Sequence, residues 1–266
     1  MASLRLGQCL RGRNRIYVIG KQLQETVWLA SNQPVIVKSL FQPPFIRPLI
    51  DEIVEPSDSP TIVLKYLDDN LLNTSLFKRL TEALNVLHDN NFVHTDVKPD
   101  NILVSYGQGD VRFTDVQLAD CGNTVPADSA YAKDGDLIGA PIWRSPEAQL
   151  RIGWGTQTDI WSFGALLITL LSADNFFLFN PDVPADHDKY ELKILQRQCQ
   201  FFGPFPLTYR EICPQETKKK PFSRISEQEM SEEDKEFILK IMKLDPRDRP
   251  SAAKLLQDEW FFGEST

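Results

Sequence analysis

The sequence lacks several features that mark simple classes of protein. Its four cysteines show no C-x-x-C spacing, so neither a zinc site nor a disulfide framework is expected. The longest apolar stretch, residues 160–171, is interrupted by Ser162 and Gly164 and is too short to span a bilayer, so it predicts a buried helix. Residues 1–15 are rich in arginine but have no continuous apolar core, so we expect no secretory signal there.

Basic charge is also scarce in this chain of 266 residues. It has 29 lysines and arginines against 37 aspartates and glutamates, which gives a net charge of −8. An acidic protein is a poor match for nucleic acid or for an anionic membrane surface, so we expect neither as a partner. The expected location is intracellular, either cytoplasmic or nuclear. The length suffices for one large domain or for two lobes with a real core.

The character of the sequence changes along the chain. Apolar and β-branched runs predict strands over residues 16–23, 26–30, 34–40, 49–54 and 61–67. Apolar residues at helical spacing predict helices over residues 73–89, 156–172, 188–201, 231–243 and 250–259. We therefore predict an α+β fold of two lobes, with a small β-rich N-lobe over residues 1–66 and a large, mainly helical C-lobe over residues 67–266.

One short run, His94–Asn101, combines side chains that suit phosphoryl transfer. Asp96 could accept a proton from an attacking hydroxyl, and Lys98 could neutralise the charge of the migrating group. Asn101, five residues after Asp96, could hold a metal ion. A plainer alternative is a turn at residues 100–101 with His94 packed in a core.

The spacing of this run resembles the catalytic loop of the eukaryotic protein-kinase family. The resemblance implies that His94 is structural and that Leu103 forms the floor of an adenine pocket. Residues 116–122 resemble the D-F-G segment, with cysteine in place of phenylalanine, which makes Asp120 the main metal ligand and Gly122 its partner in the motif. Asp115 is a rival ligand without a following glycine. The plain alternative for the motif is a turn capped by Asp120.

Two further segments extend the resemblance. Residues 139–147 resemble the stretch that ends in A-P-E, which implies a buried ion pair between Glu147 and Arg249. Residues 158–164 resemble the start of the family's central helix, where Asp159 would accept hydrogen bonds from the catalytic loop. A plain N-cap is the alternative for Asp159, and the two roles are compatible. Arg144 and residues 200–206 resemble the branch of cyclin-dependent, mitogen-activated and SR-protein kinases.

The N-terminal part carries the expected nucleotide contacts. Residues 35–38 resemble the V-A-I-K strand, so Lys38 would contact the phosphates and Ile36 would lie in the adenine pocket. Val27 would cap the adenine, and the backbones of Lys65 and Leu67 would form the hinge. The alternative for Lys38 is a solvated lysine at the edge of a strand.

The same region departs from the family pattern. No glycine-rich loop precedes the lysine strand, because Gly20 is the only glycine between residues 17 and 30. Three prolines in residues 39–50 exclude an ordinary helix there, so the N-lobe is truncated and the glutamate that should pair with Lys38 is missing. Either Glu52 substitutes, or an activating partner protein supplies the missing wall, or Lys38 is poorly oriented.

A third departure concerns regulation. Thr95 stands where the family has an arginine that receives an activation-loop phosphate, so phosphorylation of Thr124, Ser129 or Tyr131 is not expected to act as a switch.

Taken with Lys98, which is typical of the serine/threonine branch, the resemblance implies transfer of the γ-phosphoryl group of ATP to Ser or Thr hydroxyls of a protein substrate, with Mg²⁺ as the metal. The alternative is a pseudokinase that binds or scaffolds without turnover.

Overall fold

The computed structural model describes residues 4–24, 27–31, 35–39, 49–55, 61–65, 74–106, 113–172, 176–203, 222–226 and 229–262. The chain divides into two compact units. The first unit comprises residues 1–70 and 103–122, and the second comprises residues 71–102 and 123–266. The division predicted between residues 66 and 67 is a single cut, whereas in the structure the segment 103–122 returns to the first unit.

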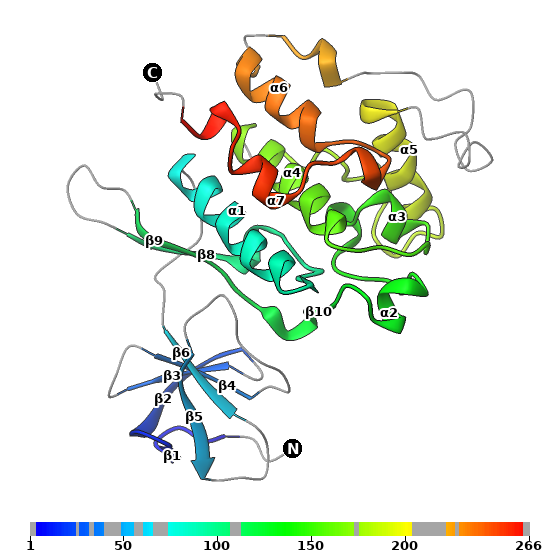
Figure 1. Cartoon of the computed structure of the whole chain (residues 1–266). Helices are drawn as coiled ribbons and strands as arrows, with labels where there is room; N and C mark the ends of the chain where they lie inside the picture. Colours follow the sequence, from blue (N-terminus) through cyan, green and yellow to red (C-terminus); the bar gives the residue numbers. More distant parts are fainter. Residues whose placement is uncertain are drawn as a thin grey trace. The chain divides into compact units, whose positions relative to one another are not determined.

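The first unit contains a closed antiparallel barrel with the strand order β1-β2-β3-β4-β6-β5 (Figure 1). Its strands are β1 (Cys9–Gly12), β2 (Ile16–Gln24), β3 (Val27–Ala30), β4 (Val35–Ser39), β5 (Leu49–Glu55) and β6 (Thr61–Lys65). Five of these match predicted strands to within a few residues. The exception is β1, which closes the barrel by pairing with both β2 and β5.

The interior of the barrel follows from alternation along its strands. In β2, Tyr17 and Ile19 are buried while Ile16 is 60% exposed, as expected when successive side chains point to opposite faces. The remaining members of the barrel core come from the other strands: Leu10, Trp28, Ala30, Ile53 and Val63.

A buried carboxylate lies at the junction of β1, β2 and β5. Asp51 accepts hydrogen bonds from the backbone amides of Arg13 (3.0 Å) and Asn14 (3.1 Å) and from the Tyr17 hydroxyl (3.0 Å). Burial opposes ionisation of Asp51, but these bonds and that from the Glu52 amide outweigh it and hold its pKa below 3.8. Burial, together with the hydrogen bond to Asp51, raises the pKa of Tyr17 to about 12. Asp51 thus ties the β1–β2 turn to β5.

The first unit also contains a separate two-stranded sheet of β8 (Ile102–Tyr106) and β9 (Phe113–Leu118). Val104, Val116 and Leu118 are buried.

The second unit is mainly helical (Figure 1). Its α-helices are α1 (Thr74–Asp89), α2 (Ala130–Lys133), α3 (Pro146–Gln149), α4 (Gln157–Leu171), α5 (Tyr190–Phe202), α6 (Glu232–Ile241) and α7 (Ala252–Leu255). It also holds a short two-stranded sheet of β7 (Phe92–Val93) and β10 (Val125–Pro126). From residue 158 to residue 169 every residue of α4 is buried, because this helix is apolar on nearly all sides.

One predicted helix is wrong in its extent. Residues 250–259 form only the single turn of α7, followed by a separate 3₁₀ turn at Glu259–Phe261. Ser251 caps the first piece, and the Asp258 side chain accepts a hydrogen bond from the Trp260 amide at the start of the second. A capping residue in the middle of an apolar pattern ends a helix that periodicity alone would continue.

The cysteines also differ from expectation at one position. Cys199, in α5, is disulfide-bonded, whereas Cys9 and Cys121 are free. Spacing along the chain gave no sign of this bond, because a disulfide requires closeness in space rather than in sequence. Among the described residues, no helix combines the length and apolar character that a bilayer crossing requires.

Candidate active site

The loop that carries Asp96 is held by a buried carboxylate of α4. The backbone amides of His94 and Thr95 donate to Asp159, at 2.8 and 2.9 Å, and Asp159 is only 1% exposed. Asp159 lies in the first turn of α4 but is not its N-cap, which is Thr156. The predicted hydrogen bonds from the loop are therefore present, and the plain N-cap alternative is wrong.

Two histidines complete this support. The Nε2 atom of His88, in the last turn of α1, lies 3.1 Å from the same oxygen of Asp159 that receives the His94 amide. His94 is fully buried, and its Nδ1 atom accepts a hydrogen bond of 3.3 Å from the Asp96 amide. Sequence analysis missed His88. The only signal was its place one turn before the loop, which does not reveal a partner 71 positions away.

Asp96 is buried, and its two carboxylate oxygens have different surroundings. Its Oδ2 atom accepts hydrogen bonds from the Lys98 ammonium group (2.7 Å) and from the Asn101 amide nitrogen (3.0 Å). Asn101 also donates to the Asp96 carbonyl at 2.7 Å. The Oδ1 atom of Asp96 is buried and accepts no hydrogen bond within the described part of the chain. The structure thus brings together the three loop residues that the sequence selected.

Gly139 lies directly against this oxygen. Its φ is +52°, and a Cβ atom at this position would lie 3.2 Å from the Asp96 Oδ1 and 2.6 Å from the Thr95 carbonyl oxygen. Only glycine adopts this backbone conformation without strain and also leaves this space open. Sequence analysis treated Gly139 as the start of a motif and did not identify this contact.

The segment after the D-F-G-like motif is connected to the same loop. The Thr95 hydroxyl donates to the Asn123 carbonyl (3.0 Å), and β10 pairs with β7 just before the loop. Thr124 is buried, and Ser129 caps α2 by accepting a hydrogen bond from the Ala132 amide. The segment is therefore held by uncharged contacts at the position where the family uses an arginine.

Arg144 fastens the end of this segment. Its guanidinium group donates to the carbonyl oxygens of Ile138 (2.6 Å) and Gly139 (3.0 Å), and it also contacts Glu191 at 3.3 Å. Burial lowers the pKa of Arg144, although the charge of Glu191 opposes this effect. Arg144 thereby fixes the backbone on which Gly139 approaches Asp96.

Glu147 and Arg249 form the predicted ion pair. Two parallel hydrogen bonds of 2.6 and 2.8 Å join the guanidinium group to the carboxylate. Both side chains are buried, with exposures of 2% and 0%. Arg249 also donates to the carbonyl oxygens of Gln157 and Lys243 at 2.9 and 2.6 Å. The pair connects α3 to the turn before α7.

The two candidate metal ligands belong to different units, Asn101 to the second and Asp120 to the first. The amide nitrogen of Asn101 points at Asp96, so the amide oxygen is the atom that would coordinate a cation. Asp120 is exposed, has a φ of +62° and precedes the 3₁₀ turn Cys121–Asn123, which contains Gly122. Its rival, Asp115, lies within β9 and accepts a hydrogen bond of 2.9 Å from Gln117. An amide oxygen and a carboxylate are hard donors, which fits Mg²⁺.

The expected nucleotide contacts are placed by strand register. Val27 pairs directly with Lys38, and Ile36 pairs with Leu64. Lys65 pairs with Val35, Leu103 lies in β8, and Leu67 lies outside the described residues. Glu52, the proposed substitute partner for Lys38, forms an ion pair with Arg13 at 2.8 Å. Both side chains of this pair are at least half exposed.

Comparison with known proteins identifies the family. The model of the protein kinase domain matches residues 39–261, so Val27, Ile36 and Lys38 precede the match. Serine/threonine-protein kinase shk1/pak1 of Schizosaccharomyces pombe is 36% identical over 104 residues, which are 39% of this chain and 15% of that protein. Probable serine/threonine-protein kinase fhkD of Dictyostelium discoideum is 30% identical over 201 residues, which are 70% of this chain and 23% of that protein.

This chain therefore spans less than a quarter of the length of either relative. Among solved structures, the yeast RNA Pol II CTD kinase CTDK-1 complex contains a chain that is similar in fold, with a TM-score of 0.74, 21% identity and 94% coverage of both chains. The predicted α+β kinase fold is confirmed, and the chain belongs to the protein kinase domain family.

Proposed function

We propose that this chain transfers the γ-phosphoryl group of ATP to Ser or Thr hydroxyls of a protein substrate. The observation that carries the proposal is the asymmetry of Asp96. One oxygen is held by Lys98 and Asn101, and the other is buried, unpartnered within the described residues and left open by the missing Cβ of Gly139. A buried acceptor without a donor is costly in a folded protein, and a substrate hydroxyl would satisfy it.

In this proposal Asp96 is the general base. The substrate oxygen attacks the γ-phosphorus, the bond from phosphorus to the β–γ bridging oxygen breaks, and ADP leaves. The hydroxyl proton passes to the Asp96 Oδ1. The ammonium group of Lys98, 2.7 Å from the other oxygen, keeps the carboxylate oriented, and in this proposal it neutralises charge on the migrating group.

Asn101 and Asp120 are the residues that would hold Mg²⁺. When bound, the ion supplies neutralisation of the phosphate charges. The contribution of the chain is orientation, because the two hydrogen bonds from Asn101 to Asp96 fix the amide group. Lys38, Ile36, Val27, Leu103 and the backbone of residues 65–67 remain the proposed contacts to ATP.

The proposed acceptor is Ser or Thr rather than Tyr. Lys98 supports this choice, and both relatives described above are named as serine/threonine kinases. Three prolines in residues 39–50 exclude the helix that carries the lysine's glutamate partner in the family. We therefore include in the proposal an activating protein that takes the place of this helix and its glutamate.

The missing glutamate partner of the lysine strand favours a second candidate function. The sequence lacks the helix and glutamate that the family places after the lysine strand, and a chain of this kind could bind nucleotide and act as a scaffold without efficient transfer.

A phosphate-transfer assay separates the two functions. Wild-type protein is incubated with Mg²⁺, γ-labelled ATP and a mixture of proteins, and the labelled amino acids are then identified. We expect phosphoserine and phosphothreonine, and we expect their loss in Asp96→Asn. Label on tyrosine would contradict the proposed acceptor class. A thermal shift with Mg-ATP but no transfer by wild type would contradict transfer by this chain on its own and favour the scaffold alternative.

A further inference from the structure

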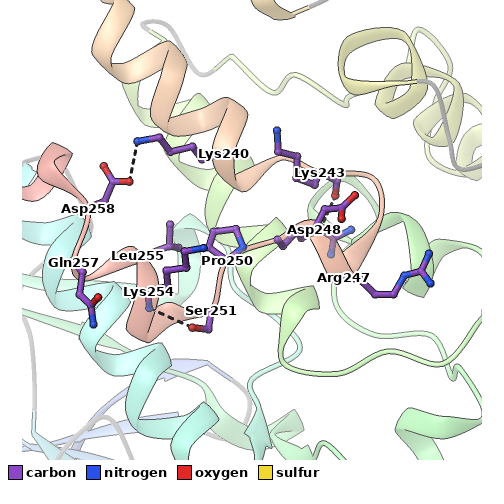
Figure 2. A pocket seen from close by; sticks show the side chains of 11 residues that line it. Lys240, Lys243, Arg247, Asp248, Pro250, Ser251, Lys254, Leu255, Gln257 and Asp258 are labelled. Atoms are coloured by element: carbon purple, nitrogen blue, oxygen red, sulfur yellow. Dashed lines mark hydrogen bonds and ion pairs between the residues drawn. The ribbon is translucent and has the colours of Figure 1, made fainter.

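A pocket in the second unit lies outside the proposed catalytic residues. It is formed by the end of α6, the turn Asp245–Arg249, and α7 with the residues that follow it (Figure 2). Its volume is about 680 Å³, which is enough for several side chains of a bound peptide.

The charge of this pocket is opposite to that of the chain. Its lining includes five cationic residues and two carboxylates, although the whole chain has a net charge of −8. The cationic residues are Lys240, Lys243, Arg247, Arg249 and Lys254. A local concentration of positive charge on an acidic protein attracts anionic partners selectively.

The cations are not equally available to a partner. The guanidinium group of Arg249 is fully buried and is neutralised by Glu147. Lys240 pairs with Asp258 at 2.9 Å, and Arg247 pairs with Asp245, but both cationic side chains are mostly exposed. Lys243 and Lys254 are exposed and form no ion pair within the described part of the chain. These two lysines are therefore the cations that a ligand can engage without displacing a carboxylate.

The directions of the side chains indicate the shape of the ligand. In Figure 2, Lys240 extends toward Asp258 on one side of the pocket, while Arg247 extends away on the other side. The two cations therefore face different sides of the pocket. In an extended peptide, side chains on one face recur about every 6.6 Å, so alternate acidic residues could meet cations at separate points.

We propose that this pocket docks an extended acidic segment of a partner protein. Carboxylates of that segment contact Lys243 and Lys254, and further carboxylates reach Lys240 and Arg247. The proposal concerns binding alone and stands whether or not the chain transfers phosphate.

The test uses the full chain and a short fluorescent peptide of alternating glutamate and valine. Fluorescence anisotropy gives its affinity, and a matched peptide with glutamine in place of glutamate shows the contribution of charge. The pocket variant is Lys243→Glu with Lys254→Glu. The control variant is Lys189→Glu with Arg224→Glu, which makes the same change in net charge at exposed positions outside the pocket. Thermal unfolding verifies that both variants fold.

We expect the wild type to bind the glutamate peptide but not the glutamine peptide, and added salt to weaken binding. The pocket variant should lose affinity by at least about tenfold, the control by less than about twofold, and Lys243→Arg with Lys254→Arg should retain binding. Equal losses in the pocket and control variants would overturn the assignment, as would the absence of binding by the wild type. Displacement of the peptide by inorganic phosphate at low concentration would identify a single-anion site instead.

Discussion

The buried ion pair between Glu147 and Arg249 makes a quantitative prediction about stability. Replacing Arg249 with methionine keeps much of the side-chain volume but removes the charge. The Glu147 carboxylate, 2% exposed, would then be buried without a counter-ion. The carbonyl oxygens of Gln157 and Lys243 would lose their donors as well. We expect Arg249→Met to lower the free energy of unfolding by about 3–5 kcal/mol.

Thermal unfolding followed by circular dichroism measures this effect. In a unit of this size, 1 kcal/mol corresponds to a change in Tm of about 2–4 °C, so we expect a decrease of roughly 6–20 °C. Arg247→Met is the matched control, because this neighbouring arginine is 84% exposed and its ion pair with Asp245 contributes about 0–1 kcal/mol.

A double-mutant cycle tests the reasoning further. Glu147→Gln removes the orphaned charge, so the double variant should lose less stability than the sum of the two single variants, by about 1–3 kcal/mol. A decrease below about 1 kcal/mol for Arg249→Met, or simple additivity in the cycle, would refute the account of the pair.

Three further predictions concern the active-site loop, the barrel and regulation. Gly139→Ala should reduce phosphate transfer by at least about tenfold, because the new Cβ would meet the Thr95 carbonyl oxygen at 2.6 Å and alanine is strained at a φ of +52°. Gly155→Ala, where nothing lies within 4 Å of the new Cβ, is the control. Equal transfer rates in the two variants would contradict the role of the Gly139 contact. Because the pKa of Tyr17 is raised from 10.0 to about 12, its contribution to stability is complete below pH 10 and is lost as the pH rises toward 12. Denaturant unfolding should show this loss in wild type, and Tyr17→Phe should remove it. The pKa of Asp51 is held below 3.8, so the contribution of Asp51 to stability is instead lost in acid, as the pH falls below that value. Phosphatase treatment should leave the transfer rate unchanged, since Thr95 holds the segment through the Asn123 carbonyl without a phosphate; a large decrease would show that phosphorylation is required.

The local parts of the site could be predicted from the sequence. Asp96, Lys98 and Asn101 lie within six residues, so a single loop brings them together whatever the rest of the fold does. The partners of Asp159 and the pairing of Glu147 with Arg249 span longer distances, and they were accessible only through resemblance to a family. Periodicity alone would have shown none of these contacts.

The remaining features depend on distant contacts that no local pattern contains. Strand β1 has only four residues, and its pairing with β5 is set by the closure of the barrel. Asp51 was expected only as part of a strand, yet it is buried and caps a turn 37 residues away. The Asp258 cap ended a helix that apolar spacing continued. For Asp51 and Asp258, a specific polar contact outweighed the general pattern.

The most direct test of the central claim is a comparison of Asp96→Asn with wild type in two measurements on the same samples. Asparagine keeps the shape of the side chain but cannot accept the hydroxyl proton as a carboxylate does. We predict that the thermal shift with Mg-ATP is unchanged, while transfer to Ser or Thr falls by at least about a hundredfold. Undiminished transfer by Asp96→Asn would contradict the assignment of Asp96 as the base.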